Sequence, residues 1–209
     1  MGPFSDRHDA GRALARSLRG RVAGDVVVLG LPRGGVPVAA EVAAELAAPL
    51  DVYLVRKLGV PRQPELALGA IASGGVRVLN DDVVRAAGIT AEELDELTRR
   101  EQGELDAREL LYRGERPALE LAGRTVVLVD DGLATGATMR AAVEAVRAAG
   151  ASHVVAAAPV APRETSAELT RAGIELVCVT TPRPFGAVGY WYRDFTPVSD
   201  AEVREALEA

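Results

Sequence analysis

The sequence predicts an α/β fold, with a doubly wound, mostly parallel sheet and helices on both of its faces. Three observations predict it. Five short runs rich in β-branched residues are apolar along their whole length, as strands buried on both faces of a sheet are. Helical patterns lie between these runs. Glycines follow the helical patterns, at the positions where helices commonly end.

The expected strands read VVVLG, VYLV, VVLV, VVAAA and ELVCV in chain order. They cover residues 26–30, 52–55, 126–129, 154–158 and 175–179. Because parallel strands end at a common edge, loops that follow them lie together, and open α/β sheets bind ligands there. The residues directly after each strand are therefore the candidate site.

The first expected helix between strands follows Gly35. There VPVAAEVAAELAA spaces Val38, Val42 and Leu46 four residues apart, and Pro37 suits a first turn. This spacing aligns the apolar side chains on one face. We expect that face to cover the sheet.

Two further helices follow later strands. One begins after Thr138 and ends at Gly150, and a shorter one over 166–172 ends at Gly173. The apolar stripe of the first consists of Met139, Ala142, Val143 and Val146. Both helices are expected to pack on the sheet.

One segment, over about 80–120, interrupts the alternation as a helical insertion after a short strand, VRVLN. Thr90 and Glu93 form a capping box at the start of a long charged helix. Its apolar stripe is narrow: Leu94, Leu97, Leu105 and Tyr112. Acid-first pairs at i,i+4 spacing are Asp95–Arg99, Glu96–Arg100 and Glu104–Arg108. We interpret it as a solvated helix packed on the core edge, with a dimerisation arm as the alternative.

Composition limits the functional classes. The chain of 209 residues suits a single domain over 1–209, and its 48% hydrophobic content argues against disorder. A formal net charge of −6 argues against non-specific binding to nucleic acid or to an anionic membrane surface. No apolar stretch approaches the roughly 18 residues of a membrane span. The single cysteine, Cys178, reads as a small buried hydrophobe and fits a reducing cytosol, so we expect a cytoplasmic protein.

The strand VVLV ends in two adjacent acids, Asp130 and Asp131, and a loop of small residues leads from them into a helix. Small side chains let backbone N–H groups converge on an anion, and a helix N-terminus adds a favourable partial charge. Carboxylates suit hydroxyl groups or a divalent cation instead. The segment therefore fits a ligand with phosphate at one end and hydroxyls or metal beside it, as in a sugar phosphate.

An ordinary strand ending in an Asp-Gly turn is the simpler alternative. It explains Asp131 and Gly132, but not the acid pair, the loop and the helix start together. A nucleotide-hydrolase strand would need a GxxxxGK[ST] loop, and the sequence has none, nor a GxSxG or HExxH motif.

The stretch VVLVDDGLATGATM resembles the signature of type I phosphoribosyltransferases, which bind 5-phosphoribosyl 1-pyrophosphate (PRPP). The resemblance covers about residues 24–195 and implies that fold, with a core over about 24–180. By position, Asp130 and Asp131 would hold the ribose hydroxyls. The 5-phosphate would lie on the loop of Ala134, Thr135, Gly136, Ala137 and Thr138.

The resemblance also assigns the end of the first strand, VVVLGLPRGGVPVA. A Gly-Gly pair permits close backbone approach, and an adjacent arginine can clamp a diphosphate, although a tight βα turn explains the same residues. In the family the pyrophosphate loop lies here, often with a non-proline cis peptide. Arg33, Gly34 and Gly35 would then bind pyrophosphate, with the cis bond between Pro32 and Arg33.

Arg56 and Lys57 arrive where the second strand finishes. Two cations there would serve the same pyrophosphate, and we assign them with the acid pair to catalysis. A solvated Arg-Lys pair at a strand end is the alternative. A mobile loop rich in proline and glycine is expected over about 58–75, where the family uses a flexible loop to cover the reacting ribose.

The C-terminal stretch RPFGAVGYWYRDFTPVSD holds five of the eight Phe, Trp and Tyr residues. The family builds a hood over the acceptor here, so residues of about 181–209, with the N-terminal segment, form the expected hood. Its candidate acceptor residues are Phe185, Val188, Trp191 and Asp194. A flat base would stack on Phe185 or Trp191, and aromatics that only seal the sheet edge are the equal alternative.

Purine enzymes of the family show a similar phenylalanine, VGY and acid, although the spacing from VGY to Asp194 is one residue longer here. They also place a lysine in the stretch that reads VVAAAPVAPRE, where Arg163 is the nearest cation. The acceptor base, purine or pyrimidine, is therefore left open.

The resemblance implies transfer of the phosphoribosyl group from PRPP to a nitrogenous base with release of pyrophosphate. The implied cofactor is Mg²⁺, carried by PRPP and held by some of Asp130, Asp131 and Asp194. The partners are small molecules, with no nucleic acid and no membrane, and homo-oligomerisation is left open. The alternative function is a non-catalytic PRPP sensor that acts through a protein partner.

Overall fold

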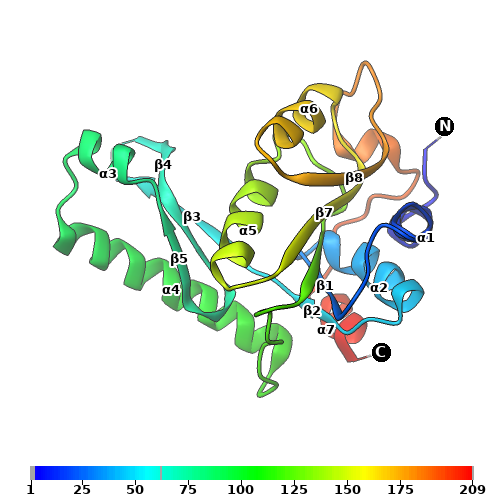
Figure 1. Cartoon of the computed structure of the whole chain (residues 1–209), viewed down its shortest axis with the longest axis horizontal. Helices are drawn as coiled ribbons and strands as arrows, with labels where there is room; N and C mark the ends of the chain where they lie inside the picture. The colour runs from blue at the N-terminus through cyan, green and yellow to red at the C-terminus, as the bar shows by residue number, and fades with distance from the viewer. Residues whose placement is uncertain (1–2, 62, 209) are drawn as a thin grey trace.

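The computed structural model describes residues 3–61 and 63–208. Figure 1 shows two parts, an α/β core and an arm that extends from one side of it. The core contains a parallel sheet with strand order β2-β1-β6-β7-β8, in which every neighbouring pair is parallel. The strands are β1 (Val26–Gly30), β2 (Leu50–Val52), β6 (Thr125–Val129), β7 (His153–Val160) and β8 (Glu175–Thr180). The predicted doubly wound, mostly parallel sheet is confirmed.

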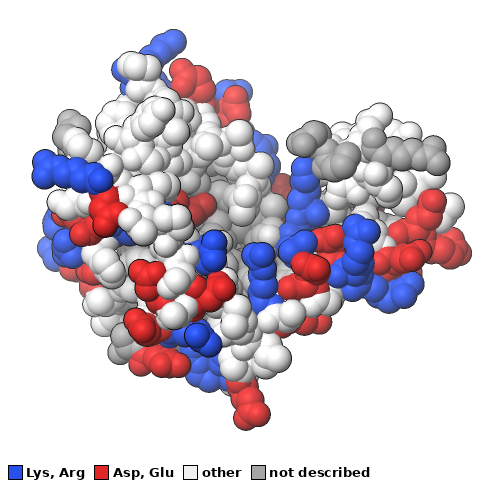
Figure 2. Space-filling view, turned by 180° about the vertical axis from the view of Figure 1, so that it is seen from behind, with Lys and Arg blue, Asp and Glu red and all other residues white. Residues whose placement is uncertain are grey.

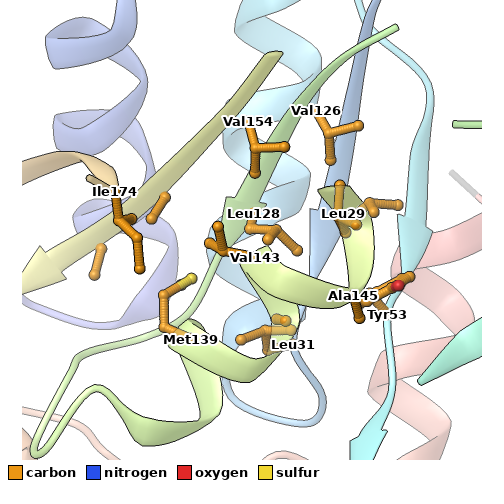
Figure 3. Packing of buried hydrophobic residues seen from close by; sticks show 14 of the residues in the cluster. Leu29, Leu31, Tyr53, Val126, Leu128, Met139, Val143, Ala145, Val154 and Ile174 are labelled. Atoms are coloured by element: carbon orange, nitrogen blue, oxygen red, sulfur yellow. The ribbon is translucent and has the colours of Figure 1, made fainter. Parts of the chain in front are cut away.

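Helices cover both faces of this sheet. On one face lie α1 (Arg7–Leu18) and α2 (Gly35–Leu46), whose Leu14, Leu18, Val38 and Val42 are fully buried against the sheet. On the other lie α5 (Ala137–Ala148) and α6 (Arg163–Arg171). Figure 3 shows Met139 and Val143 of α5 packed against Leu128 and Val154 of the sheet. These two buried layers hold the strand ends in place.

The predicted strand over 52–55 is displaced in the structure. β2 ends at Val52, and β3 (Val55–Val60) begins a different sheet. Between them, the Leu54 N–H donates to Ser73 Oγ at 2.9 Å and the Ser73 N–H donates to the Leu54 carbonyl at 2.9 Å. The chain leaves the parallel sheet at this point because the backbone N–H and carbonyl of Leu54 bond to Ser73 and not to a neighbouring parallel strand.

The arm is a three-stranded antiparallel sheet of order β3-β4-β5, covered by two helices. Its elements are β3, β4 (Gln63–Ala72), a 3-10 turn η1 (Ser73–Gly75), β5 (Val76–Leu79), α3 (Asp81–Ala87) and α4 (Ala91–Arg113). The prediction of a loop over 58–75 is therefore wrong. Leu58, Leu68 and Ile71 are fully buried in a cluster that includes Leu94 and Leu105 of α4, and this burial stabilises the hairpin.

The long helix α4 begins with the predicted capping box of Thr90 and Glu93. Its apolar stripe contacts the arm sheet, with Leu105 fully buried. The ion pairs described for this helix differ from the expected i,i+4 set, since Asp95 pairs with Arg77 at 3.1 Å and Glu104 with Arg56 at 3.6 Å. The sheet offers cations on its facing side, and the carboxylates of α4 pair across to them.

A buried ion pair fastens the arm to the core. Arg113, at the end of α4, donates from Nε to both carboxylate oxygens of Asp51 in β2, at 2.9 and 3.0 Å. Arg113 Nη2 also donates to the Val52 carbonyl at 2.7 Å. Both charged side chains are less than a tenth exposed. The arm is thereby anchored on the edge strand of the parallel sheet.

The two ends of the chain lie on the core. The C-terminal segment contains a 3-10 turn η2 (Val188–Trp191) and α7 (Asp200–Glu208), which packs on α2, α4 and β2. Phe4 forms a parallel bridge with Tyr192, so the start of the chain runs beside the segment after β8. Within residues 3–61 and 63–208, no helix combines the length and the apolar character needed to cross a membrane.

Candidate active site

The acid pair follows β6 directly, at the edge where the parallel strands end. The Asp130 N–H donates to the Ala157 carbonyl of β7 at 3.2 Å, which continues the sheet ladder by one residue. The Asp131 N–H donates to Asp130 Oδ1 at 2.9 Å. Both side chains are half-buried. The sheet therefore fixes the backbone that carries the two carboxylates.

The electrostatic setting of the two carboxylates is unusual. Burial, and then the negative charge of Asp131, raise the pKa of Asp130 to about 8. Burial also raises the pKa of Asp131, against the opposing effect of a hydrogen bond and charge from Arg7. A pair of this kind gains from any ligand that brings hydroxyl donors or positive charge, because such groups favour the ionised carboxylates.

Hydrogen bonds to β7 and α6 hold the loop after the acid pair on one side, and its other side is exposed to solvent. Leu133 is buried, and its N–H donates to the Val160 carbonyl at 2.9 Å. Thr165 Oγ1 donates to the Ala134 carbonyl at 2.7 Å. Gly136 takes a left-handed φ of 72° at the start of α5. The exposed residues are Ala134, Thr135, Ala137 and Thr138, which surround the N-terminus of α5 where an anion is favoured.

The predicted pyrophosphate loop lies directly against the acid pair. A Cβ on Gly34 would meet Asp131 Oδ2 at 2.0 Å, and one on Gly35 would meet the Val129 carbonyl oxygen at 2.6 Å. Only glycine fits so close an approach. The peptide bond between Pro32 and Arg33 is cis, as predicted. Two loops that lie far apart in the sequence thus form one surface.

Arg33 extends from this loop toward α7. Its Nη1 lies 3.8 Å from Asp200 Oδ1, and half of the side chain is exposed. The same Asp200 oxygen accepts a hydrogen bond from the Tyr112 hydroxyl of α4 at 2.8 Å. The arm, the C-terminal helix and the predicted pyrophosphate loop therefore meet at Asp200.

The two predicted cations of β3 have different surroundings. Arg56 pairs with Glu101 of α4 at 2.7 Å. Against the opposing effect of burial, hydrogen bonds from Arg56 and Arg100 lower the pKa of Glu101. Lys57 lines two grooves: one of about 610 Å³ with Thr135 and Thr138, and one of about 800 Å³ with Glu93, Glu96 and Glu101 of α4. Lys57 therefore lies between the loop of residues 134–138 and α4, whereas Arg56 is paired with Glu101 of α4.

The hood residues are brought near the acid pair through Val188. A Cβ on Gly132 would meet Val188 Cγ1 at 2.4 Å, so the hood contacts the start of the loop after the acid pair. The Trp191 indole N–H donates to the Phe185 carbonyl at 3.0 Å, which joins the two predicted stacking residues. Asp194 is exposed and accepts from the Thr196 hydroxyl and N–H, which lower its pKa.

Two residues of the site were not predicted from the sequence. Arg7 of α1 donates from Nε to Asp131 Oδ2 at 2.8 Å, and the buried Tyr192 donates its hydroxyl to the Asp131 carbonyl. Burial raises the pKa of Tyr192, so it stays a neutral donor. Arg7 lies 124 residues from Asp131 in the sequence, and no local pattern around it indicates this contact.

The donors present suit a metal only in part. Within the described ranges no group of three or more His, Cys, Asp or Glu side chains is arranged to hold a metal ion. Asp130 and Asp131 supply two carboxylates, and Asp194 is bound to Thr196. Mg²⁺ is commonly held in proteins by one or two carboxylates together with substrate phosphates. The acid pair fits a Mg²⁺ that arrives with a phosphate ligand.

Figure 2 shows how charged side chains are distributed over one face of the molecule. Lys and Arg side chains are interspersed there with Asp and Glu over both the core and the arm. This face therefore carries no continuous field of one sign of the kind that attracts a polyanion non-specifically.

Comparison with known proteins identifies relatives over most of the chain. The model of the phosphoribosyl transferase domain matches residues 6–177. Proteins of two Mycobacterium tuberculosis strains, provisionally named phosphoribosyl transferases, are 54% identical over 205 residues. The match covers 98% of this chain and 46% of theirs, so this chain spans about half the length of those relatives.

Two solved structures match nearly the whole chain. The protein TT1426 from Thermus thermophilus is 45% identical, with a TM-score of 0.90 over 98% of this chain and 97% of its own. A protein from Neisseria gonorrhoeae is 14% identical, with a TM-score of 0.51 over 99% of this chain and 95% of its own. At that identity the second likeness concerns the fold alone.

Proposed function

Because the chain belongs to the phosphoribosyl transferase family, we propose that it transfers the 5-phosphoribosyl group of PRPP to a nitrogenous base and releases pyrophosphate. One observation carries the proposal: the Gly34–Gly35 loop lies directly against Asp130 and Asp131, beside the open N-terminus of α5. A phosphate, two hydroxyls and a second anionic group can be bound along that one surface.

The 5-phosphate of PRPP would lie on the loop of residues 134–138. Its oxygens would accept hydrogen bonds from backbone N–H groups and from the hydroxyls of Thr135 and Thr138. The left-handed Gly136 and the bond from Thr165 to the Ala134 carbonyl support this assignment, because they hold the loop open in one shape.

Pyrophosphate would lie toward Gly34, with Arg33 and Lys57 as its candidate cations. Lys57 lines the groove that contains Thr135 and Thr138, and Arg33 is half exposed at the loop tip. Positive groups placed beside the leaving group stabilise the charge that develops on it. Bound Mg²⁺ would supply further positive charge to the pyrophosphate oxygens.

The ribose hydroxyls would donate to Asp130 and Asp131, which hold C1 of the sugar between the leaving group and the hood. The bond from C1 to the pyrophosphate oxygen breaks, and its electron pair leaves with pyrophosphate. A nitrogen of the base forms the new bond to C1. Where that nitrogen carries a proton, the proton passes to a neighbouring proton acceptor of the protein. Asp131 is the candidate acceptor because of its central place in the motif.

A flat acceptor would bind against the hood. Phe185 and Trp191 are half-buried and joined by a hydrogen bond, and Val188 connects them to Gly132 beside the acid pair. This arrangement supports stacking of a base within reach of the ribose. Both purine and pyrimidine bases fit that description.

The experiment is to incubate the chain with Mg-PRPP and a panel of purine and pyrimidine bases, and to measure nucleotide formation and pyrophosphate release. Stoichiometric nucleotide and pyrophosphate with at least one base are expected. Mg-PRPP binding without product for any base would contradict the catalytic proposal and favour a PRPP sensor. Absence of both binding and turnover would contradict both.

A further inference from the structure

The N-terminal segment is fastened along the hood by main-chain contacts. The Phe4 N–H donates to the Trp191 carbonyl at 2.7 Å, and the Arg193 N–H donates to the Phe4 carbonyl at 2.8 Å. The Asp194 N–H donates to the Ser5 carbonyl at 3.0 Å. This short parallel pairing fixes the start of α1 beside the acid pair, so the position of Arg7 is set by the fold.

Arg7 itself is held on three sides. Its Nη1 donates to the Thr196 carbonyl at 2.8 Å, and its guanidinium lies 4.0 Å from the ring centroid of Phe195. From there Nε reaches Asp131 Oδ2 at 2.8 Å, with the Arg7 side chain only 11% exposed. A guanidinium fixed by a carbonyl and an aromatic ring is pre-organised for one carboxylate.

We propose that Arg7 is a positioning residue for the ribose: by binding Oδ2 of Asp131, it fixes the carboxylate so that Oδ1 accepts a ribose hydroxyl. This inference rests on the proposed function. Two adjacent carboxylates repel one another, and Arg7 also offsets that repulsion where the ligand binds. Tyr192 holds the Asp131 backbone from the same side, so side chain and backbone are positioned together.

An opposite role is physically conceivable for the same contact. A guanidinium on Asp131 could compete with the ribose hydroxyls and keep the site closed. The two roles predict opposite signs, since loss of a positioning residue weakens binding and loss of a competitor strengthens it. Mg-PRPP affinity therefore decides between them.

The test is isothermal titration of Mg-PRPP into the wild type, Arg7→Gln, Arg7→Lys and a matched control, Arg12→Gln. Arg12 lies on the same helix, is half exposed, and pairs only loosely with Asp9 and Glu41 at 3.7 and 3.6 Å. We expect Arg7→Gln to weaken affinity about tenfold or more, because a charge-assisted hydrogen bond is lost. Arg7→Lys should lose less than Arg7→Gln but bind more weakly than the wild type, because it keeps the cation but cannot hold Asp131 and Thr196 together as the guanidinium does. Arg12→Gln should match the wild type.

A double-mutant cycle with Asp131→Asn separates positioning from a general structural role. If Arg7 acts through Asp131, Arg7→Gln adds less than about twofold on the Asp131→Asn background. Two results overturn the inference. One is that Arg7→Gln weakens Mg-PRPP affinity on the Asp131→Asn background as much as it does in the wild type. The other is that Arg7→Gln alone binds Mg-PRPP as tightly as the wild type, or more tightly. Should Arg7→Gln not fold, as judged by thermal melting, Arg7→Lys decides. Wild-type affinity in Arg7→Lys overturns the inference, as does a full additional loss when Arg7→Lys is combined with Asp131→Asn.

Wild-type chain that binds no Mg-PRPP overturns the proposed function, and this inference with it. Wild-type chain that binds Mg-PRPP while Arg7→Gln binds equally well overturns the inference alone. The two failures are thus distinguishable in one series of titrations.

Discussion

At the scale of single residues, the site depends on how closely two chain segments approach. Gly35 packs on the Val129 carbonyl and on Asp130, and Gly34 packs on Asp131. Neither glycine has a positive φ, so the demand is for space. The Gly-Gly pair and the acid pair can each be recognised in the sequence. Only the fold shows that the two pairs pack directly against each other.

We predict that Gly35→Ala destabilises the protein by about 1–3 kcal/mol, the usual cost of overpacking. The new Cβ would lie 2.6 Å from the Val129 carbonyl oxygen, which is held in the sheet and cannot move aside. Gly103→Ala is the control: it lies in α4 with nothing within 4 Å of the added carbon, and should stabilise by up to about 1 kcal/mol. Urea unfolding of both variants measures the difference, and equal stabilities would contradict the prediction.

The pKa of Asp130 predicts how stability depends on pH. Burial and Asp131 raise this pKa to about 8 from an ordinary value of 3.8, so the folded chain keeps a proton that the unfolded chain releases. That contribution is present below about pH 4 and is lost as the pH rises toward about 8. The wild type should lose stability against Asp130→Asn between about pH 5 and pH 8, by at most about 1.4 kcal/mol per pH unit.

Thermal melting of the wild type and Asp130→Asn across that pH range is the measurement. Asparagine keeps an oxygen that can accept the Asp131 N–H, so the local hydrogen bond is retained. Parallel pH profiles for the two proteins would mean that Asp130 titrates near its ordinary value.

At the scale of elements, four strands of the core, the short strand β5 and the long helix α4 were predictable, and the β3–β4 hairpin of the arm was not. Four of the apolar runs match β1, β6, β7 and β8 within about two residues, because buried parallel strands need apolar residues on both faces. In the arm, Leu68 and Ile71 are both buried although they lie three residues apart. The register shift between Leu58 and Gly59 explains this, because a bulge breaks the alternation by which strands are recognised.

The surroundings of the two cations of β3 predict different roles for them, because only Lys57 lines the groove that contains Thr135 and Thr138. Lys57→Gln should weaken Mg-PRPP binding about tenfold, because Lys57 lines the groove that contains Thr135 and Thr138 of the proposed phosphate loop. Arg56→Gln should leave that affinity within about threefold, because Arg56 pairs with Glu101 of α4. Titration of Mg-PRPP into both variants distinguishes them, and a larger loss for Arg56→Gln would restore Arg56 to the pyrophosphate site.

The joint between arm and core predicts a strong effect from one side chain. Arg113→Met leaves Asp51 buried without its cation, and should lower the free energy of unfolding by about 3–5 kcal/mol. Arg85→Met is the control, since Arg85 and its partner Asp82 are exposed and should contribute less than about 1 kcal/mol. Urea unfolding measures both, and similar small losses would show that the arm is held by its apolar contacts alone.

At the scale of the whole molecule, residues from the entire length of the chain converge on one edge of the parallel sheet. Arg7 comes from the first helix, Gly34 from the loop after β1, Asp131 from the loop after β6, and Tyr192 from the hood. The loops after strands were predictable, since parallel strands end together. Arg7 and Tyr192 were not, because their contacts depend on how the two ends of the chain pack on the core.

The most direct measurement of the central claim is the affinity for Mg-PRPP of Asp130→Asn/Asp131→Asn, against the wild type and Asp81→Asn/Asp82→Asn. The control removes a second adjacent acid pair, which lies exposed in the first turn of α3. We predict that the wild type and the control bind alike, while the site variant loses about a hundredfold or more, since two charge-assisted contacts are removed. Equal binding by all three proteins would contradict the account.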